Sequence, residues 1–325
     1  MGRNDEAIKW LLDAYERRPQ RAEPLYWLAR IHRLSGRNHL ARHFAQAAGE
    51  LAYPSDKLFV ERDIYEFSIR DELSIASYYT GDYLASERLC RELLADGSCP
   101  PPQLPRVRKN LEFARRRAKN MVFGLGTGRC GTSTLAALLD RQQGYRVTHE
   151  SRLLPWQRTP QGTRHLLRRI QSYDAECVGD VAFYYLNYVE PVLLETDRAK
   201  FICLRRDREE TIQSYLRWTG PKNHWTSRSS PAWNGDWIDD RYDDCYPKFA
   251  AEKTEAIGLY WDHYYSRAES LAVEFPESFR VFPIESLSSE RGQIEILQFL
   301  GIDFAKMAVD TDLRLNAQST PLSGD

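Results

Sequence analysis

Residues 121–135 constrain the fold of this chain more than any other stretch; they read Met-Val-Phe-Gly-Leu-Gly-Thr-Gly-Arg-Cys-Gly-Thr-Ser-Thr-Leu. The segment opens with a mostly apolar run, Met121 to Leu125, and continues into glycines. After Gly131 the period changes, because three leucines beginning at Leu135 have the i, i+3, i+4 spacing of one buried helix face. This pattern predicts a strand, a glycine-rich turn and the N-terminus of a helix.

A turn of this kind favours an oxyanion, since it exposes several backbone N–H groups and the helix dipole adds partial positive charge. The loop of nucleotide triphosphatases is G-x-x-x-x-G-K-[ST]. Gly126 and Gly131 have that spacing, and Ser133 is in place. Thr132, however, stands at the lysine position, and the cation is Arg129 instead. Because that lysine neutralises the β- and γ-phosphates together with Mg²⁺, a loop without it suits a less highly charged group.

Alternating strand and helix patterns follow the loop and predict an α/β domain. Short strands are expected at 144–149, 177–182, 200–204 and 279–283, with helices at 164–173, around 186–194, from 208 and at 293–300. Strands separated by helices indicate a doubly wound parallel sheet. Ligands of such sheets bind beyond the carboxyl ends of the strands, where the loop after Gly124 is expected.

A second polar pair follows the strand predicted at 200–204. Arg206 stands at the end of this strand, and Ser214 comes eight residues later inside the next predicted helix. A guanidinium fork and a hydroxyl donor that converge on one phosphate bind it with charge-assisted hydrogen bonds. Arg206 followed by Asp207 is also compatible with an ordinary surface pair, but the upstream loop favours the phosphate interpretation.

Arg129-Cys-Gly-Thr-Ser133 resembles the 5′-phosphosulfate loop of sulfotransferases, which transfer a sulfuryl group from 3′-phosphoadenylyl sulfate (PAPS). In that family an arginine at a strand end and a serine eight residues later hold the 3′-phosphate, as Arg206 and Ser214 are expected to do here. The resemblance covers roughly residues 120–303 and implies a P-loop-like domain with PAPS as cosubstrate and no metal. The cofactor-binding residues that it implies are Gly128, Arg129, Cys130, Gly131, Thr132, Ser133, Arg206 and Ser214.

Residues 146–155 look like the segment of protein-tyrosine sulfotransferases in which a glutamate deprotonates the acceptor. The resemblance implies that Glu150 is the general base, that Arg152 contacts the cofactor or the acceptor, and that Arg129 assists catalysis. Many cytosolic sulfotransferases use histidine instead, and His149 is adjacent. Because neighbouring residues of a strand point to opposite faces, we expect only one of the two to face the sulfur, and we favour Glu150.

The first hundred residues contain an internal repeat. Leu28, Gly36 and Phe44 line up with Leu73, Gly81 and Leu89 at a shift of 45 residues. Two such helix–turn–helix units resemble degenerate tetratricopeptide repeats, which implies an all-α domain that binds a peptide or protein partner, or only packs as a scaffold. We expect helical repeats over 1–99, a proline-rich linker and basic helix over 100–119, and the sulfotransferase domain over 120–325.

Composition argues against several other classes. Lys+Arg 45 against Asp+Glu 46 gives a net charge of −1, so neither a nucleic-acid nor a membrane surface is indicated. We find neither an apolar run long enough to span a membrane nor a signal-peptide pattern. The six cysteines lack metal-ligand spacing. The sequence therefore predicts a cytoplasmic protein without a metal.

The acceptor stays open between a protein tyrosine, a glycan hydroxyl and a small metabolite. The tryptophan-rich stretch from Trp218 to Trp237 predicts either a lid over the acceptor or a long loop pinned to the domain. Two other functions also stay open. One is a Mg²⁺-nucleotide-dependent P-loop enzyme, which Thr132 disfavours, and the other is a non-catalytic interaction protein built on the repeats.

Overall fold

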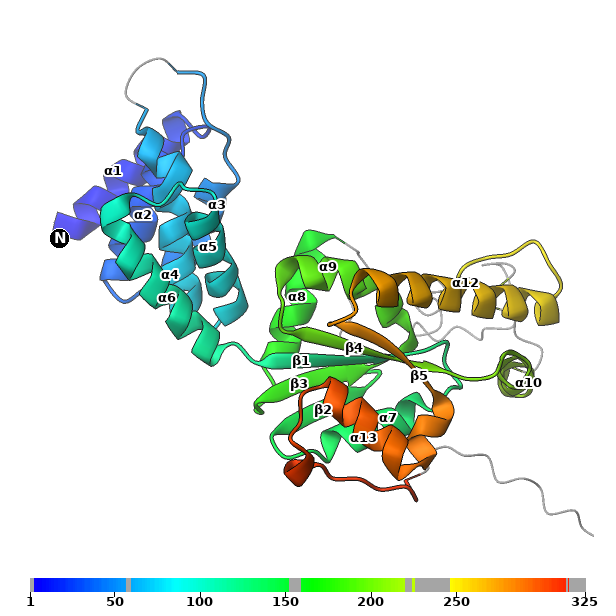
Figure 1. The fold of residues 1–325 in the computed structure, drawn as a ribbon. Coiled ribbons are helices and arrows are strands. Elements are labelled where there is room, and N and C mark those ends of the chain that lie inside the picture. The colour runs from blue at the N-terminus through cyan, green and yellow to red at the C-terminus, as the bar shows by residue number, and fades with distance from the viewer. Residues whose placement is uncertain are drawn as a thin grey trace, which may run out of the picture. The chain divides into compact units, whose positions relative to one another are not determined.

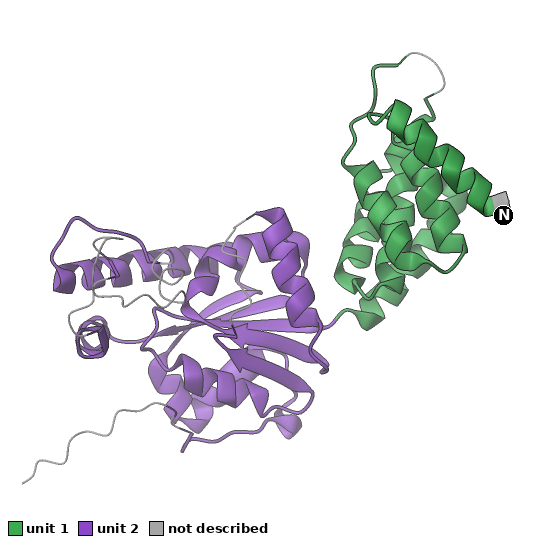
Figure 2. Ribbon diagram, turned by 180° about the vertical axis from the view of Figure 1, so that it is seen from behind, with its two compact units in different colours: residues 1–118 green, residues 119–325 purple. Residues whose placement is uncertain are grey.

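The computed structural model describes residues 3–56, 60–151, 159–219, 224–225, 246–313 and 315. The chain divides into two compact units, residues 1–118 and residues 119–325 (Figure 2). Apolar core clusters lie within unit 1 and within unit 2, so each unit is described by itself.

All secondary-structure elements among the described residues of unit 1 are helical (Figure 1). Each helix packs mainly on the next one along the chain, which is typical of helical repeats. Leu25, Leu28 and Ala48 belong to the core of its first half, and Leu93 and Val107 to that of its second half. The elements are α1 (Arg3–Arg17), α2 (Glu23–Leu34), α3 (Asn38–Gly49), the π-helical turn η1 (Ile64–Ser68), α4 (Ile69–Tyr79), α5 (Tyr83–Ala95), the 3₁₀ turn η2 (Pro101–Gln103) and α6 (Leu104–Arg117).

The two glycine turns of unit 1 share one geometry. Gly36, between α2 and α3, has φ 72°, and Gly81, between α4 and α5, has φ 81°. In each turn the residue after the glycine donates its backbone N–H, at 2.9 Å, to a carbonyl oxygen five residues earlier. Only glycine adopts this left-handed φ without steric cost. The spacing of 45 residues in the sequence therefore corresponds to a helix–turn–helix geometry that occurs twice.

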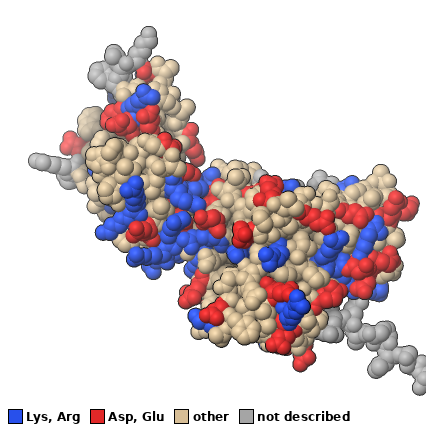
Figure 3. Space-filling view, in the orientation of Figure 1, with Lys and Arg blue, Asp and Glu red and all other residues tan. Residues whose placement is uncertain are grey.

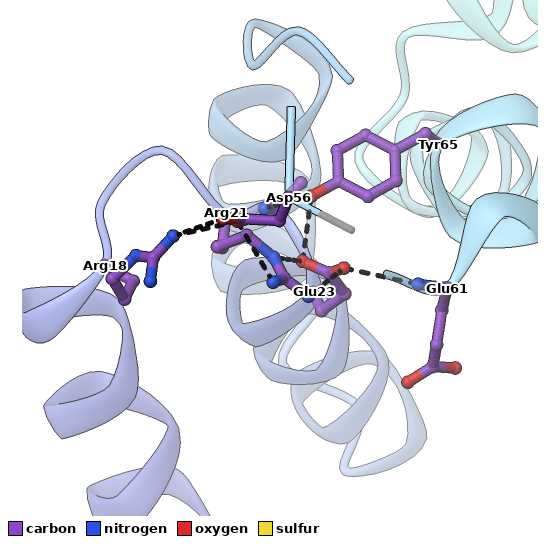
Figure 4. A network of polar contacts seen from close by, with 7 residues as sticks. Arg18, Arg21, Glu23, Asp56, Glu61 and Tyr65 are labelled. Atoms are coloured by element: carbon purple, nitrogen blue, oxygen red, sulfur yellow. Dashed lines mark hydrogen bonds and ion pairs between the residues drawn. The ribbon is translucent and has the colours of Figure 1, made fainter. Parts of the chain in front are cut away.

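A polar network fastens the segment between α3 and α4 to the first two helices (Figure 4). Asp56 accepts hydrogen bonds from Arg18 at 2.8 Å and from Arg21 at 3.3 Å. Glu23, the first residue of α2, accepts from Arg21 at 2.7 Å and from the hydroxyl of Tyr65 at 2.8 Å. These contacts hold the residues that lengthen the repeat beyond a simple helical hairpin.

Residues 100–119, which the sequence analysis separates from both domains, mostly form α6 in the structure. This helix packs on α5 and buries Val107 and Ala114, so it belongs to unit 1. Basic side chains gather over its outer face (Figure 3). Because the sequence of this helix is rich in arginine, its narrow apolar stripe is difficult to recognise from the sequence. The boundary between the units falls after Ala118.

Among the described residues, unit 2 contains a five-stranded sheet whose strands all run parallel. The chain leaves the central strand first toward β2 and β3, and only later toward β4 and β5. The strand order therefore reverses at β1, and in open parallel sheets ligands bind outside the carboxyl ends of strands at such a point. The order is β2-β3-β1-β4-β5, with β1 (Asn120–Leu125), β2 (Tyr145–His149), β3 (Cys177–Val181), β4 (Ala199–Arg205) and β5 (Phe279–Pro283).

Helices cover both faces of this sheet, as the alternating pattern predicts (Figure 1). α7 and α13 lie on one face, where Leu135 and Ile296 join the core. α8, α9 and α12 lie on the other, where the ring of Phe123 stacks on Phe201 and meets Tyr185 edge-on. The bounds are α7 (Thr132–Asp140), α8 (Pro160–Gln171), α9 (Val189–Glu195), α10 (Arg208–Thr219), α12 (Lys253–Glu274) and α13 (Glu290–Phe299).

The helix expected around 186–194 differs from the prediction. It starts as the 3₁₀ helix η3 (Phe183–Tyr188) and becomes α-helical only in α9. Pro191 has no N–H to donate and fits the first turn of an α-helix, so α9 begins just before it. Two further 3₁₀ helices, η4 (Ile284–Ser288) and η5 (Phe304–Lys306), flank α13.

Candidate functional site

Two buried tyrosines bind the backbone of the loop between β1 and α7. The hydroxyls of Tyr215 in α10 and Tyr260 in α12 both donate to the carbonyl oxygen of Thr127, the latter at 2.8 Å. A Cβ at Gly128 would lie 2.4 Å from the Tyr215 hydroxyl, so only glycine fits there. The loop is therefore fixed by residues that follow it by about ninety positions or more in the chain.

α7 begins at Thr132, directly after Gly131, whose φ of 86° is left-handed. Among the described residues, no side chain caps this helix. Its first turn therefore offers backbone N–H groups and the positive end of the helix dipole, which is the arrangement that binds anions.

Arg129, Arg206 and Ser214 lie together beside this helix start. Nε of Arg129 donates to Oγ of Ser214 at 3.2 Å, and Nη1 of Arg206 donates to the carbonyl oxygen of Arg129 at 3.0 Å. Arg206 also pairs with Glu210 at 3.0 Å. The motif after β1 and the motif after β4 thus form one cluster, although each was found separately in the sequence.

The cluster borders a cavity of about 560 Å³. Six of the eight predicted cofactor residues line it: Arg129, Gly131, Thr132, Ser133, Arg206 and Ser214. Gly128 and Cys130 do not belong to its lining. Cys130 is fully buried, and burial raises the pKa of its thiol to about 11, so it packs under the loop as an uncharged side chain.

Arg217 lines the same cavity and was missed in the sequence. It lies three residues after Ser214 on α10, and residues three apart share a face of a helix. That spacing is the signal from which it could have been found. Arg217 adds a third guanidinium to the cavity wall.

The cavity lining also contains acidic and apolar side chains. Glu210 and Glu285 belong to it, together with the apolar residues Ile284, Leu287, Leu313 and Leu315. The last two belong to a C-terminal segment that two buried side-chain amides clamp in place. Gln142 exchanges two hydrogen bonds of 2.9 Å with the backbone of Ala308, and Gln293 exchanges bonds of 2.7 and 2.8 Å with the backbone of Asp310, as two β-strands would.

His149, the last residue of β2, faces the hydroxyls of α7. Its Nε2 lies 3.1 Å from Oγ1 of Thr132 and 3.4 Å from Oγ of Ser133. Burial lowers the pKa of His149, and the charge of Asp180 offsets part of this effect. The imidazole is thus a neutral partner of the loop hydroxyls near neutral pH.

Glu150 follows β2 in a turn rather than within the strand, so the alternation expected from the sequence stops one residue earlier. Its φ is 46°, and its backbone N–H donates to the carbonyl oxygen of Val181 at 3.0 Å. Burial, with a contribution from Asp180, raises its pKa to about 7. The charge of the carboxylate also contributes to the raised pKa of Tyr215, whose hydroxyl binds the loop between β1 and α7. Glu150 does not line the cavity of Arg129.

Asp180 was also missed in the sequence. It lies on β3, and its side chain is fully buried beside the turn of Glu150. The sequence feature that could have identified it is that it is the one charged residue of the short strand Cys-Val-Gly-Asp-Val.

Two other sequence predictions fall wholly or partly outside the described residues. The first is Arg152, which lies outside them. The second is the tryptophan-rich stretch, of which Trp233 and Trp237 lie outside them. Trp225 is fully buried against the rings of Tyr215 and Tyr260, as in a segment pinned to the domain. Trp218 is half exposed, and the guanidinium of Arg129 lies 5.8 Å from its ring centroid.

A scan against models of known protein families and a search of curated proteins both return no match. Among the described residues, no group of His, Cys, Asp and Glu side chains is arranged to hold a metal ion. Within the same residues, no helix combines the length and apolar character needed to cross a membrane.

Proposed function

We propose that this chain is a PAPS-dependent sulfotransferase. The observation that carries the proposal is the convergence of Arg129, Arg206 and Ser214 on one cavity beside the first turn of α7. The resemblance to sulfotransferases rests on two motifs some eighty residues apart, and their meeting at one anion-binding site supports reading them together. The cavity volume of about 560 Å³ lies within the ordinary range for a nucleotide-sized ligand.

We assign the two anionic groups of PAPS to the two motifs that line the cavity. The N–H groups of α7, with Arg129 and the hydroxyls of Thr132 and Ser133, would hold the 5′-phosphosulfate. Arg206 and Ser214 would hold the 3′-phosphate, a group that ATP does not have. The apolar side chains of the lining would contact the adenine ring.

In the proposed reaction an acceptor hydroxyl attacks sulfur in line. The acceptor oxygen forms the new S–O bond, while the bond between sulfur and the bridging oxygen of the 5′-phosphate breaks. Arg129 and the N–H groups of α7 stabilise the negative charge that develops on the departing phosphate. Glu150 takes the acceptor proton, an effect of about 10²–10⁴-fold. The products are the sulfated acceptor and 3′,5′-adenosine bisphosphate.

Glu150 is assigned as the base in preference to His149. The ring nitrogen of His149 is engaged with Thr132 and Ser133, so this residue is assigned to orienting the loop hydroxyls. The carboxylate of Glu150 forms no hydrogen bond within the described part of the chain, and its pKa of about 7 suits proton transfer at neutral pH.

Nucleotide binding tests the proposal without knowledge of the acceptor. The melting of the full chain is followed while 3′,5′-adenosine bisphosphate, 5′-AMP or ATP with Mg²⁺ is titrated in. A ligand at about 100 times its dissociation constant adds roughly 2.7 kcal/mol of stability. We expect a shift with the bisphosphate at concentrations at which 5′-AMP produces none.

A shift with Mg·ATP alone would replace the proposal with a nucleotide-dependent P-loop enzyme. No shift with any nucleotide would favour a non-catalytic interaction protein built on unit 1. Where the bisphosphate binds, release of 3′,5′-adenosine bisphosphate from PAPS in the presence of tyrosine peptides, glycans or simple phenols identifies the acceptor class.

A further inference from the structure

The carboxylate of Asp180 is buried directly beneath the turn that carries Glu150. Oδ1 accepts the hydroxyl of Thr148 at 2.6 Å, and Oδ2 accepts the hydroxyl of Tyr185 at 2.7 Å. The backbone N–H of Ser151 lies 3.3 and 3.4 Å from the two oxygens. The carboxylate thus receives donors from β2, from η3 and from the turn itself.

The same turn is tied to β3 at two consecutive residues. The N–H of Glu150 donates to the carbonyl oxygen of Val181, and the N–H of Ser151 is held by Asp180. Glu150 keeps a left-handed φ of 46° in this arrangement. A non-glycine residue holds such a conformation only where its surroundings fix it. The contacts on either side of Glu150 provide that support.

We propose that Asp180 is a positioning residue for Glu150, and that its carboxylate fixes the turn and sets the electrostatic surroundings of the catalytic base. This inference rests on the proposed function, in which Glu150 accepts the acceptor proton. Asp180 itself is fully buried and hydrogen bonded, so it does not reach a substrate and acts only through Glu150.

The two carboxyl groups differ in what surrounds them. Burial raises the pKa of both, but the hydrogen bonds to Asp180 from Thr148, Tyr185 and Ser151 act in the opposite direction. Within the described residues Glu150 receives no such bonds, so hydrogen bonding favours the ionised form of Asp180 and does not favour that of Glu150. Where the surroundings of two neighbouring acids give them different pKa values, the difference indicates which of the two exchanges protons.

The ionisable groups of this pair and its surroundings come from four elements. Asp180 of β3 acts on Glu150 and on His149 at the end of β2. Tyr185 of η3 donates its hydroxyl to Asp180, and burial raises the pKa of its phenol. Tyr215 of α10 completes the set, since the charge of Glu150 acts on its phenol. Tyr215 and His149 are neutral near pH 7, because burial raises the pKa of the phenol and lowers that of the imidazole. The charge of Asp180 is therefore the one that Glu150 experiences most strongly.

Asp180→Asn tests the inference, with Asp140→Asn as its matched control. The asparagine keeps a carbonyl oxygen for Ser151 and Thr148 but removes the charge. Asp140 also binds the backbone of β2, since its Oδ1 accepts the N–H of Val147 at 2.8 Å, yet it does not act on Glu150. The full-length chain is labelled with ¹³C at the glutamate carboxyl groups and titrated by NMR, and Glu150→Gln identifies the signal of Glu150.

We expect Glu150 to titrate near pH 7 in the wild type and lower by about one pH unit or more in Asp180→Asn, because a like charge raises a carboxyl pKa by an amount of this order. Asp140→Asn is expected to leave the titration unchanged. If Asp180→Asn does not fold, Thr148→Val weakens the charged form of Asp180 and should move Glu150 in the same direction by less. An unmoved Glu150, or an equal shift in the Asp140 control, would overturn the inference.

Binding of 3′,5′-adenosine bisphosphate is measured on the same samples. We expect Asp180→Asn to bind it as tightly as the wild type, because Asp180 does not line the cavity of Arg129. A wild type that fails to bind the bisphosphate would end the proposed function, whereas the carboxyl titration would still decide whether Asp180 controls Glu150. The two failures are thus distinguishable.

Discussion

Arg129 and Glu150 share a backbone conformation that no other non-glycine residue of the described chain adopts: their φ angles are 57° and 46°. For a residue with a Cβ, this left-handed region costs roughly 1–2 kcal/mol. Both residues are held in it by neighbouring segments, since the carbonyl oxygen of Arg129 accepts from Arg206 and the N–H of Glu150 donates to Val181. Backbone strain is therefore concentrated at the two residues proposed to act on the reacting groups, which is where strain tends to occur in enzymes.

Arg129→Gly and Arg129→Ala separate the role of the guanidinium from that of the left-handed backbone conformation. Both remove the guanidinium that binds Ser214, so both should weaken bisphosphate binding by roughly tenfold or more. Only glycine relieves the left-handed φ, so the glycine variant should be more stable than the alanine variant by about 1 kcal/mol. Denaturant-induced unfolding of the two variants without nucleotide measures this difference in stability. Equal stabilities would mean that the φ of 57° stores no strain.

Arg206→Ala is expected to weaken binding of 3′,5′-adenosine bisphosphate by roughly 10- to 100-fold, as expected for a lost charged hydrogen bond. Arg205→Ala is the matched control, because Arg205 is the adjacent residue but pairs with Glu269 and stacks on Trp261, away from the cavity. Titration calorimetry with the bisphosphate and with 5′-AMP measures both. An equal loss of affinity for 5′-AMP would contradict the assignment of Arg206 to the 3′-phosphate.

The sheet of unit 2 could be predicted closely because its strands are short apolar runs bounded by polar or glycine-containing turns. β5 is found at Phe279–Pro283 as expected, β2 and β3 differ from the prediction by one residue at one end, and β4 is longer by one residue at each end. Helix starts were harder, since they depend on single capping residues. α8 begins at Pro160, four residues early, because the hydroxyl of Thr159 accepts the N–H of Gly162 at 3.1 Å.

The candidate site could be predicted where its residues follow a strand at a fixed spacing. Arg129 follows β1 in this way, Arg206 and Ser214 follow β4, and the structure brings the three together. Leu313 and Leu315 were out of reach, because the amides of Gln142 and Gln293 that clamp their segment make contacts with no local pattern. A tertiary contact across 166 residues leaves no periodic signal in the sequence.

Tyr260→Phe tests whether the loop conformation limits nucleotide binding. The substitution removes one of the two hydroxyls on the carbonyl oxygen of Thr127, so we expect a loss of about 1 kcal/mol of stability and a several-fold loss of bisphosphate affinity. Thr211→Val is the control, because it removes the hydroxyl of a fully buried side chain from the carbonyl oxygen of Asp207, outside the loop. Thermal melts and calorimetry compare the two. Equal losses of affinity would point to general loosening of the core.

Glu150→Gln should make stability less dependent on pH. The carboxyl pKa is raised in the folded state from its usual value of 4.5 to about 7, so between these values the folded chain holds a proton that the unfolded chain releases. Folding stability is therefore lost as pH rises through this range, by up to about 3 kcal/mol at pH 8. The glutamine variant does not titrate, so its melting temperature should exceed that of the wild type by several degrees at pH 8 and match it near pH 5.

Paired melting curves at these two pH values measure the effect, and Glu176→Gln, near the start of β3, serves as a control that should leave the pH dependence of the wild type in place. A Glu150→Gln variant that gains nothing at pH 8 would show that the carboxylate of Glu150 is ionised without cost in the folded chain. Its pKa would then lie near the ordinary value, and Glu150 would be a weak base at neutral pH. The proton acceptor of the proposed reaction would have to be sought in His149, whose Nε2 already lies against the hydroxyls of Thr132 and Ser133.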